Sequence, residues 1–221
     1  MTLDRTVRDY TPFVEYMIMR YEGPYGWSLA DPGGPTKYGI TCFDLAEFMH
    51  EPMDSMTRWA PLVRAMSLAT ADQIYAVKYA TACRFNELHP GKDCEVFDFG
   101  VNSGPSRAIK CAQAIVGVAQ DGFLGPATLD AINAYPAGHF INHLSAARLN
   151  FLRSLSIWPT FRKGWSARVA DLRRYSWALL QPAKEQVVPT KKLGLIPLAS
   201  AKGWPSADDL IKQYRDKNVA E

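Results

Sequence analysis

Apolar residues recur at helical spacing near the start of the chain, and the pattern predicts an amphipathic helix over residues 10–21. Thr11 suits the capping position of this helix and Pro12 its first turn. The helix is expected to stop at Glu22, because a glycine and a proline follow directly. Residues 25–41 are rich in glycine, proline and aromatic residues and have little helical period, which is typical of tight turns and a short hairpin.

Helical spacing returns several times later in the chain. It predicts helices over residues 42–49, 71–83, 126–134, 139–155 and 165–180, and one more that opens after Pro105 and runs to Val116. Thr70 and Gln73 form a capping-box pattern before the second of these helices. Several helices, short turns and at most one small hairpin predict an α+β fold that is mostly helical.

The composition is that of a globular protein with a real core. Of 221 residues, 48% are hydrophobic and 21% charged, with a net charge of +3. Mild basicity helps a protein approach an anionic surface such as a cell wall, but no basic stripe with interleaved aromatics indicates nucleic acid as a partner. We find neither a signal-peptide pattern nor an apolar run of membrane-spanning length. We therefore expect a protein held in the cytoplasm, without stable membrane insertion.

The four cysteines show no metal-binding pattern. They contain no CxxC pair and have no histidine cluster to complete a site, so we expect no metal and no other cofactor. Buried free thiols are the favoured interpretation, although an even number also allows a disulfide.

Two acids between residues 22 and 41 stand in a setting that suits glycoside chemistry. Hydrolysis of a glycosidic bond needs a proton donor at the leaving oxygen and a second group that stabilises or attacks the sugar. Glu22 ends an apolar helix near Tyr25 and Trp27, where burial would keep a carboxyl protonated at neutral pH. Asp31 follows in a turn rich in glycine and proline. A solvated helix end and an ordinary turn are the commoner roles of such residues, so the residues alone leave catalysis open.

The same segment resembles the N-terminal signature of glycoside hydrolase family 108, a family of N-acetylmuramidases that includes phage endolysins. The match reads Glu22-Gly23-x-Tyr25, then Asp31-Pro-Gly-Gly-x-Thr36-x-x-Gly39-Ile40-Thr41. Ile74-Tyr75-x-x-x-Tyr79 resembles the family's next helix. Two later motifs resemble peptidoglycan-binding regions: Val96-Phe97-Asp98-Phe99-x-x-Asn102-Ser103-Gly104-Pro105-x-x-Ala108 and Asp121-Gly122-x-x-Gly125-Pro126-x-Thr128.

The resemblance implies a lysozyme-like fold, with a small β-hairpin region after the first long helix. It implies a lysozyme-like catalytic part over residues 1–84 and a helical peptidoglycan-binding part over residues 85–180, packed together into one domain. Residues 181–221 lie outside the resemblance. Their prolines and lysines predict a linker or surface strap, followed by a short terminal helix.

By the resemblance, Glu22 is the catalytic acid. Asp31 is either the base that activates a water or a residue that only pins its turn. Thr36 either helps to place that water or caps the turn. The carboxylate separation that distinguishes inverting from retaining enzymes is not readable from sequence.

Five further residues are candidates for binding the glycan. Tyr25, Trp27 and Tyr38 would stack on sugar rings, or else pack into the core. Asp98 and Asn102 lie one helical turn apart and would line the cleft. Alternatively, Asp98 satisfies nearby backbone amides, which we favour, and Asn102 caps or turns the chain.

The expected function is that of an endolysin-type muramidase, cleaving the β-1,4 bond between N-acetylmuramic acid and N-acetylglucosamine in bacterial peptidoglycan. The endolysin resemblance implies a monomer that reaches the wall through a holin-type pore and lyses the host cell. A non-catalytic wall-binding or secretion-related protein is one alternative. A lytic transglycosylase, which needs a glutamate but no water-activating base, is another.

Overall fold

The structure is a computed structural model of the whole chain, and the residues it describes are 13–14, 21, 25–27 and 34–181. They form two compact units. Of the described residues, 13–14, 21 and 75–181 belong to the first unit, and 25–27 and 34–74 belong to the second. The predicted division into a catalytic part over residues 1–84 and a binding part over residues 85–180 stays a prediction; the two compact units meet along the chain between Ile74 and Tyr75.

A two-stranded antiparallel hairpin opens the well-described part of the second unit. Strand β1 (Thr36–Lys37) pairs with β2 (Ile40–Thr41). Tyr38 and Gly39 connect them, with φ angles of 53° and 73°. A two-residue turn with both φ angles positive matches the twist of the strands that it joins. The hairpin predicted between residues 25 and 41 is confirmed.

Three helices complete the described part of the second unit: α2 (Cys42–Phe48), α3 (Met56–Ala65) and α4 (Leu68–Ile74). Thr41 and Asp44 form a capping box at the start of α2, which confirms the predicted helix there. Helix α3 was not predicted, and it carries Pro61 in its interior. Its Trp59 and Val63 are fully buried and supply much of this unit's core.

The predicted capping box at Thr70 is wrong. Helix α4 begins at Leu68, and the Ser67 hydroxyl accepts a hydrogen bond from the Thr70 N–H at 3.0 Å. Thr70 therefore lies inside the first turn, and Ser67 caps it. After Ile74 the helical path widens into the π-helix η1 (Tyr75–Ala80), which belongs to the first unit.

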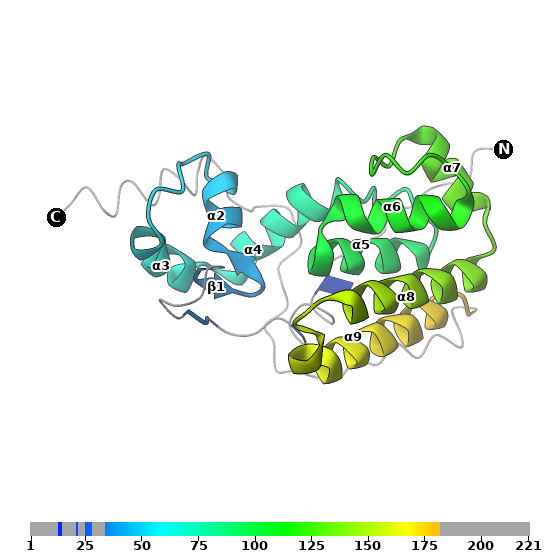
Figure 1. Ribbon diagram of the computed structural model, residues 1–221. Helices are drawn as coiled ribbons and strands as arrows, with labels where there is room; N and C mark the ends of the chain where they lie inside the picture. The colour runs from blue at the N-terminus through cyan, green and yellow to red at the C-terminus, as the bar shows by residue number, and fades with distance from the viewer. Residues whose placement is uncertain (1–12, 15–20, 22–24, 28–33, 182–221) are drawn as a thin grey trace. The chain divides into compact units, whose positions relative to one another are not determined.

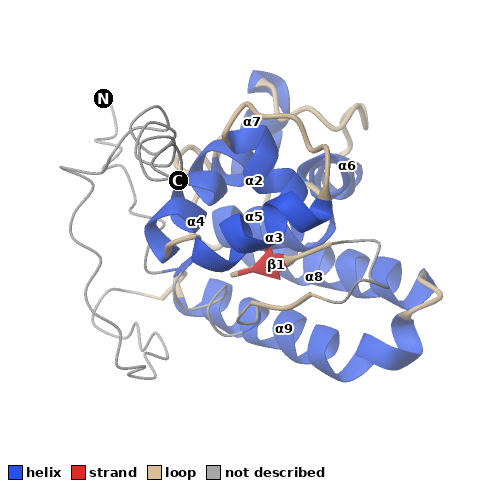
Figure 2. Cartoon of the chain, turned by 90° about the vertical axis from the view of Figure 1, so that its left-hand side faces the viewer, coloured by secondary structure: helices blue, strands red, loops and turns tan. Residues whose placement is uncertain are grey.

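The first unit is built around α5 (Lys92–Ser103). Figure 1 shows α5 beside α6 (Pro105–Val116) and next to the antiparallel pair α8 (Ala137–Ser154) and α9 (Trp158–Ala178). Figure 2 shows α8 and α9 side by side as well. The short α7 (Pro126–Ala134) packs on α6. Every residue from 91 to 100 is buried, so α5 is the centre of this unit's core.

The start of the chain contributes to the same core. Phe13 and Val14 are helical and buried, and Tyr21 is helical and half-buried. The Phe13 ring lies 6.2 Å from that of Phe85 and 5.2 Å from that of Tyr175. The rest of the predicted first helix lies outside the described residues, as do residues 182–221.

Most other predicted elements of the first unit are confirmed. Helices α6 and α7 match their predicted ranges, and α8 begins two residues earlier than predicted. Helix α9 begins at Trp158 rather than Trp165, and α5 was not predicted as a helix at all. None of these described helices is both long and apolar enough to cross a membrane.

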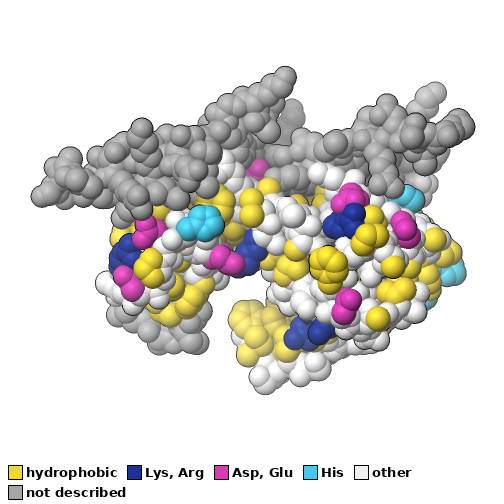
Figure 3. All heavy atoms as spheres, turned by 90° about the horizontal axis from the view of Figure 1, so that it is seen from above, with side chains coloured by type: hydrophobic (Ala, Val, Ile, Leu, Met, Phe, Trp, Pro, Cys, Tyr) yellow, Lys and Arg dark blue, Asp and Glu magenta, His cyan; other side chains and the backbone are white. Residues whose placement is uncertain are grey.

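The cysteines and the acidic side chains form no metal-binding cluster on the part of the chain that the structure describes. The four cysteines are free, three of them buried and Cys111 half-buried. On the face shown in Figure 3, acidic and basic side chains are intermixed, and no extended field of one sign dominates it.

Candidate functional site

The two predicted catalytic acids, Glu22 and Asp31, lie outside the described residues, so their placement stays a prediction. Residues on either side of each acid are described. They show how the chain is held directly before Glu22 and on both sides of the loop that contains Asp31.

Tyr21, the residue before Glu22, is anchored to helix α9. Its hydroxyl donates a hydrogen bond to the Asp171 carboxylate. The guanidinium of Arg168 lies 5.7 Å from the centre of its ring. Asp171 is itself buried and is also paired with Arg174. Tyr21 is therefore held against α9 by Asp171 and Arg168, which are both buried.

The loop that contains Asp31 is closed at its base. The Gly26 N–H donates to the Thr36 carbonyl at 2.9 Å, and the Thr36 N–H donates to the Gly26 carbonyl at 2.9 Å. This antiparallel pair extends the hairpin by one bridge and brings Gly26 and Thr36, on either side of the segment with Asp31, next to each other. The Thr36 hydroxyl also lies 3.4 Å from the Gly26 carbonyl, a long hydrogen bond that favours a turn-closing role for this side chain.

Gly34 explains part of the Asp-Pro-Gly-Gly motif on structural grounds. Its φ of 72° lies in the left-handed region, and a Cβ built on it would lie 2.7 Å from the Cys42 sulfur. Any other residue would be strained in both respects. The glycine therefore allows the loop to return tightly onto the start of α2.

The aromatic candidates Tyr25 and Tyr38 gather around the end of helix α3. The Arg64 guanidinium lies 4.4 Å from the centre of the Tyr25 ring, and the Lys37 ammonium lies 5.0 Å from that of Tyr38. Lys37 also donates to the carbonyls of Arg64 and Met66, at 2.8 and 2.7 Å. A cation over one face of the Tyr25 ring does not occupy its other face. Both half-buried rings remain candidates for contact with a sugar.

Trp27 is half-buried in the same unit. Its indole N–H is shielded from solvent and has no acceptor among the described residues. A buried donor without an acceptor is costly, so this N–H has hydrogen-bonding capacity left for a ligand or for a residue outside the described ranges.

Asp98, a predicted glycan-binding residue, lies instead at the centre of the first unit's core. Its side chain is 0% exposed, and its carboxylate pairs with Arg148 at 2.7 Å and Arg168 at 2.8 Å. Burial opposes its ionisation, but the two guanidinium groups outweigh burial and lower the pKa of Asp98 to about 2. The structure places this residue away from any surface open to a glycan. The partners of its carboxylate are two arginines, and not the backbone amides that the sequence led us to expect.

Glu95 lies one turn before Asp98 in the same buried cluster, and the sequence analysis did not identify it. The Ser145 hydroxyl donates to its carboxylate at 3.1 and 3.2 Å. Burial raises the pKa of Glu95 to about 8, against the opposing charge of Arg148. With 1% of its surface exposed, Glu95 has no open path to a substrate. Its perturbed pKa therefore reflects a role in packing.

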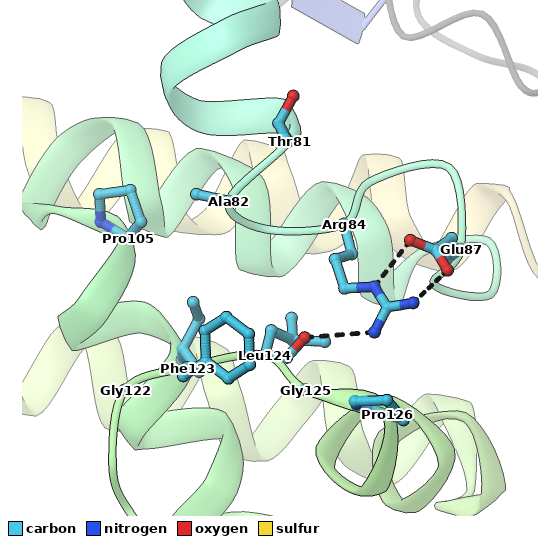
Figure 4. A pocket seen from close by; sticks show the side chains of 11 residues that line it. Thr81, Ala82, Arg84, Glu87, Pro105, Gly122, Phe123, Leu124, Gly125 and Pro126 are labelled. Carbon is cyan, nitrogen blue, oxygen red and sulfur yellow. Dashed lines mark hydrogen bonds and ion pairs between the residues drawn. The ribbon is translucent and has the colours of Figure 1, made fainter.

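A surface hollow lies between the loop after η1, the start of α6 and the loop before α7 (Figure 4). Its volume is about 510 Å³, and its apolar lining includes Pro105, Ile109 and Leu124. Arg84 crosses one side, where its Nε donates to Glu87 at 2.7 Å and its Nη1 to the Leu124 carbonyl at 3.4 Å. The ring of Phe123 is 70% exposed at the same site.

The Asp121-Gly122-x-x-Gly125 motif forms one wall of this hollow, and Gln113 holds it in place. The Gln113 amide donates to the Asp121 carboxylate at 2.7 Å and to the Phe123 carbonyl at 3.1 Å. It also accepts from the Gly122 N–H at 2.9 Å. The motif is therefore a rigid structural loop.

Nowhere in the described ranges do histidine, cysteine or acidic side chains gather as a metal site would require.

Two comparisons with known proteins found matches. The family model for glycosyl hydrolase 108 matches residues 16–104. The chain is also similar to the solved structure of Brucella abortus SagA, with 34% identity and a TM-score of 0.69 over 79% of this chain and 95% of that one. The chain belongs to glycosyl hydrolase family 108. A comparison with curated proteins gave no match.

Membership of family 108 implies a glycoside hydrolase. The matched residues contain Glu22, Asp31 and Thr36 and extend to Asn102. Asn102 is half-buried in the last turn of α5, and its side-chain oxygen accepts from the Ser103 hydroxyl at 3.2 Å. Gly104, not Asn102, occupies the cap position of α6. Asn102 therefore remains a candidate for glycan contact.

Proposed function

We propose that this family 108 protein is an endolysin-type muramidase with a lysozyme-like fold. It hydrolyses the β-1,4 bond between N-acetylmuramic acid and N-acetylglucosamine in bacterial peptidoglycan. The observation that carries the proposal is the family match over residues 16–104, because it includes both Glu22 and Asp31 in an unbroken motif. The similarity to SagA over 79% of the chain supports the same assignment.

In the proposed mechanism, Glu22 protonates the leaving glycosidic oxygen, and Asp31 activates the attacking water or stabilises the developing charge on the sugar. The anchoring of Tyr21 supports this role for Glu22, because consecutive Cα atoms are only about 3.8 Å apart. Fixing Tyr21 to α9 thus restricts the position of the acid. The Gly26–Thr36 pair similarly restricts the loop with Asp31. A proton donor must be held in place to act efficiently.

Within the second unit, Tyr25, Trp27 and Tyr38 are the proposed stacking residues for the glycan. Taken by itself, the apolar hollow of the first unit beside Phe123 suits an acetyl or lactyl group. The protein would be made in the cytoplasm and reach the wall through a holin-type pore. These parts of the proposal rest on the family resemblance and on the chemistry of the side chains.

The test is loss of turbidity of purified peptidoglycan with wild type, Glu22→Gln and the control Glu47→Gln. Glu47 lies on the exposed side of α2, so its substitution should leave activity unchanged. We expect Glu22→Gln to lose at least roughly a hundredfold in rate while keeping its fold, because a positioned general acid contributes on that scale. Equal rates for all three proteins would remove Glu22 from the mechanism. Inactivity of all three would favour the non-catalytic wall-binding alternative.

A further inference from the structure

The junction of α8 and α9 presents large apolar side chains to solvent. We define the α8–α9 tip as Arg153, Ile157, Trp158, Phe161, Arg162, Lys163 and Trp165. Ile157 is 51% exposed and Phe161 is 49% exposed, four residues apart on the chain. Figures 1 and 2 show this junction as the turn that joins the two long helices. Exposed apolar side chains that cluster in this way usually mark an interaction surface.

Three aromatic rings of the tip pack against one another. The rings of Phe161 and Trp165 are stacked, 5.3 Å apart with an interplanar angle of 25°, and those of Trp158 and Trp165 are 6.2 Å apart and tilted by 35°. These residues follow one face of α9, at spacings of three and four. Each of these rings therefore packs against at least one other ring. Ile157 lies directly before them on the chain and is exposed.

The exposed charges of the tip are all positive. Arg162 and Lys163 are exposed, and the Arg153 guanidinium lies 5.9 Å from the centre of the Trp158 ring. The sequence contains no aspartate or glutamate from residue 131 to residue 170. Helix α9 also begins here with no acid in its first turn, so the positive end of its dipole is not offset. The tip therefore combines exposed apolar groups with positive charge, and no acid stands near it along the chain.

We propose that the α8–α9 tip binds the surface of an anionic phospholipid membrane. In this binding mode, the side chains of Ile157 and Phe161 enter the interface between headgroups and acyl chains, together with the exposed parts of the Trp158 and Trp165 rings. Arg153, Arg162 and Lys163 meet the lipid phosphates. Exposed apolar side chains gain from leaving water, whereas a glycan site needs side chains that accept hydrogen bonds from sugar hydroxyls, and the side chains of the tip have none. This binding goes beyond the proposed hydrolysis and does not depend on it.

The test is sedimentation of the full-length protein with vesicles of phosphatidylglycerol and phosphatidylcholine in equal parts, and with vesicles of phosphatidylcholine alone. We expect binding to the anionic vesicles that weakens with added salt. The pair Arg162→Gln and Lys163→Gln should weaken it roughly 25-fold, because each cation near an anionic surface contributes about a factor of five. The pair Ile157→Ser and Phe161→Ser should weaken it by on the order of tenfold, through lost apolar burial.

Matched controls lie elsewhere on the first unit. Lys110→Gln with Arg173→Gln removes two exposed cations outside the tip, and Val77→Ser removes a side chain that is 65% exposed. These controls should bind like wild type, and circular dichroism should confirm that every variant is folded. Vesicle binding that survives both tip variants would overturn the proposal. So would absent vesicle binding together with tip-dependent binding to purified peptidoglycan, which would assign the tip to the glycan.

Discussion

The buried charges around Asp98 allow a demanding prediction about stability. Asp98→Asn keeps the shape of the side chain and removes its charge. It leaves Arg148 and Arg168 in the core without their counter-ion, at 1% and 5% side-chain exposure. The Nε and Nη2 atoms of Arg148 are already buried without a hydrogen bond, so no other hydrogen bond of Arg148 offsets the loss.

The size of the effect follows from this arrangement. Breaking a buried ion pair by removing one partner costs about 3–5 kcal/mol, because an uncompensated charge stays in the core. Glu95 modifies that cost, since its pKa is about 8 in the wild type and the Asp98 charge helps to keep it there. In the variant Glu95 ionises more readily and supplies a replacement negative charge. The loss should therefore be larger at pH 5 than at pH 8.

The assay is urea unfolding followed by far-ultraviolet circular dichroism at both pH values. The matched control is Asp54→Asn, which removes the same charge from an exposed pair with Arg58, 3.0 Å apart. The control should cost less than about 1 kcal/mol. If Asp98→Asn costs no more than the control, or costs the same at pH 5 and pH 8, the account of the buried cluster is wrong.

Three further predictions concern other contacts of the first unit. Tyr21→Phe removes the hydroxyl that donates to Asp171 on α9 and should lower the free energy of unfolding in urea by about 1–2 kcal/mol. It should also lower kcat for wall hydrolysis at unchanged KM. An unchanged kcat would exclude a positioning role of Tyr21 toward Glu22. The raised pKa of Glu95 adds stability that is fully present below about pH 4.5 and lost as the pH rises through 8, so thermal melts of wild type should fall over this range and those of Glu95→Gln should stay flatter. Gly122→Ala places a Cβ against the Ser106 hydroxyl at a φ of 80° and should lower the free energy of unfolding by about 2–3 kcal/mol. Gly117→Ala, at a φ of 75° with open space around the Cβ, should lower it by only about 1 kcal/mol. Equal losses for the two variants would contradict the packing argument.

Elements with one buried face were predictable from sequence. Helices α6 and α7 have a proline in the first turn and apolar residues at helical spacing, and their predicted ranges are confirmed. Helix α5 was missed because residues 91–100 are buried on every side, so no amphipathic period marks it. Helix α3 was missed where Pro61 interrupts the pattern, although Trp59 and Val63 are buried by its fold.

The candidate site was predictable to a different degree. The motif from Glu22 to Thr41 predicted the family, because the motif is long and its residue types and spacing are specific. Asp98 was considered a cleft residue because a charged side chain is rarely buried in a protein core. Its partners Arg148 and Arg168 are 50 and 70 residues away, so no local pattern could reveal the ion pairs. The nearest sequence signal was arginine on helices that are otherwise packed through apolar faces.

The most direct test of the central claim is mass spectrometry of peptidoglycan fragments after digestion with wild type and borohydride reduction. A muramidase that hydrolyses the bond leaves N-acetylmuramic acid at each new reducing end, and the proposed function predicts reduced muramic acid as the dominant end group. Anhydro-muramic ends would instead show a lytic transglycosylase. Reduced N-acetylglucosamine ends would show cleavage of the other glycosidic bond, and either result would contradict the account.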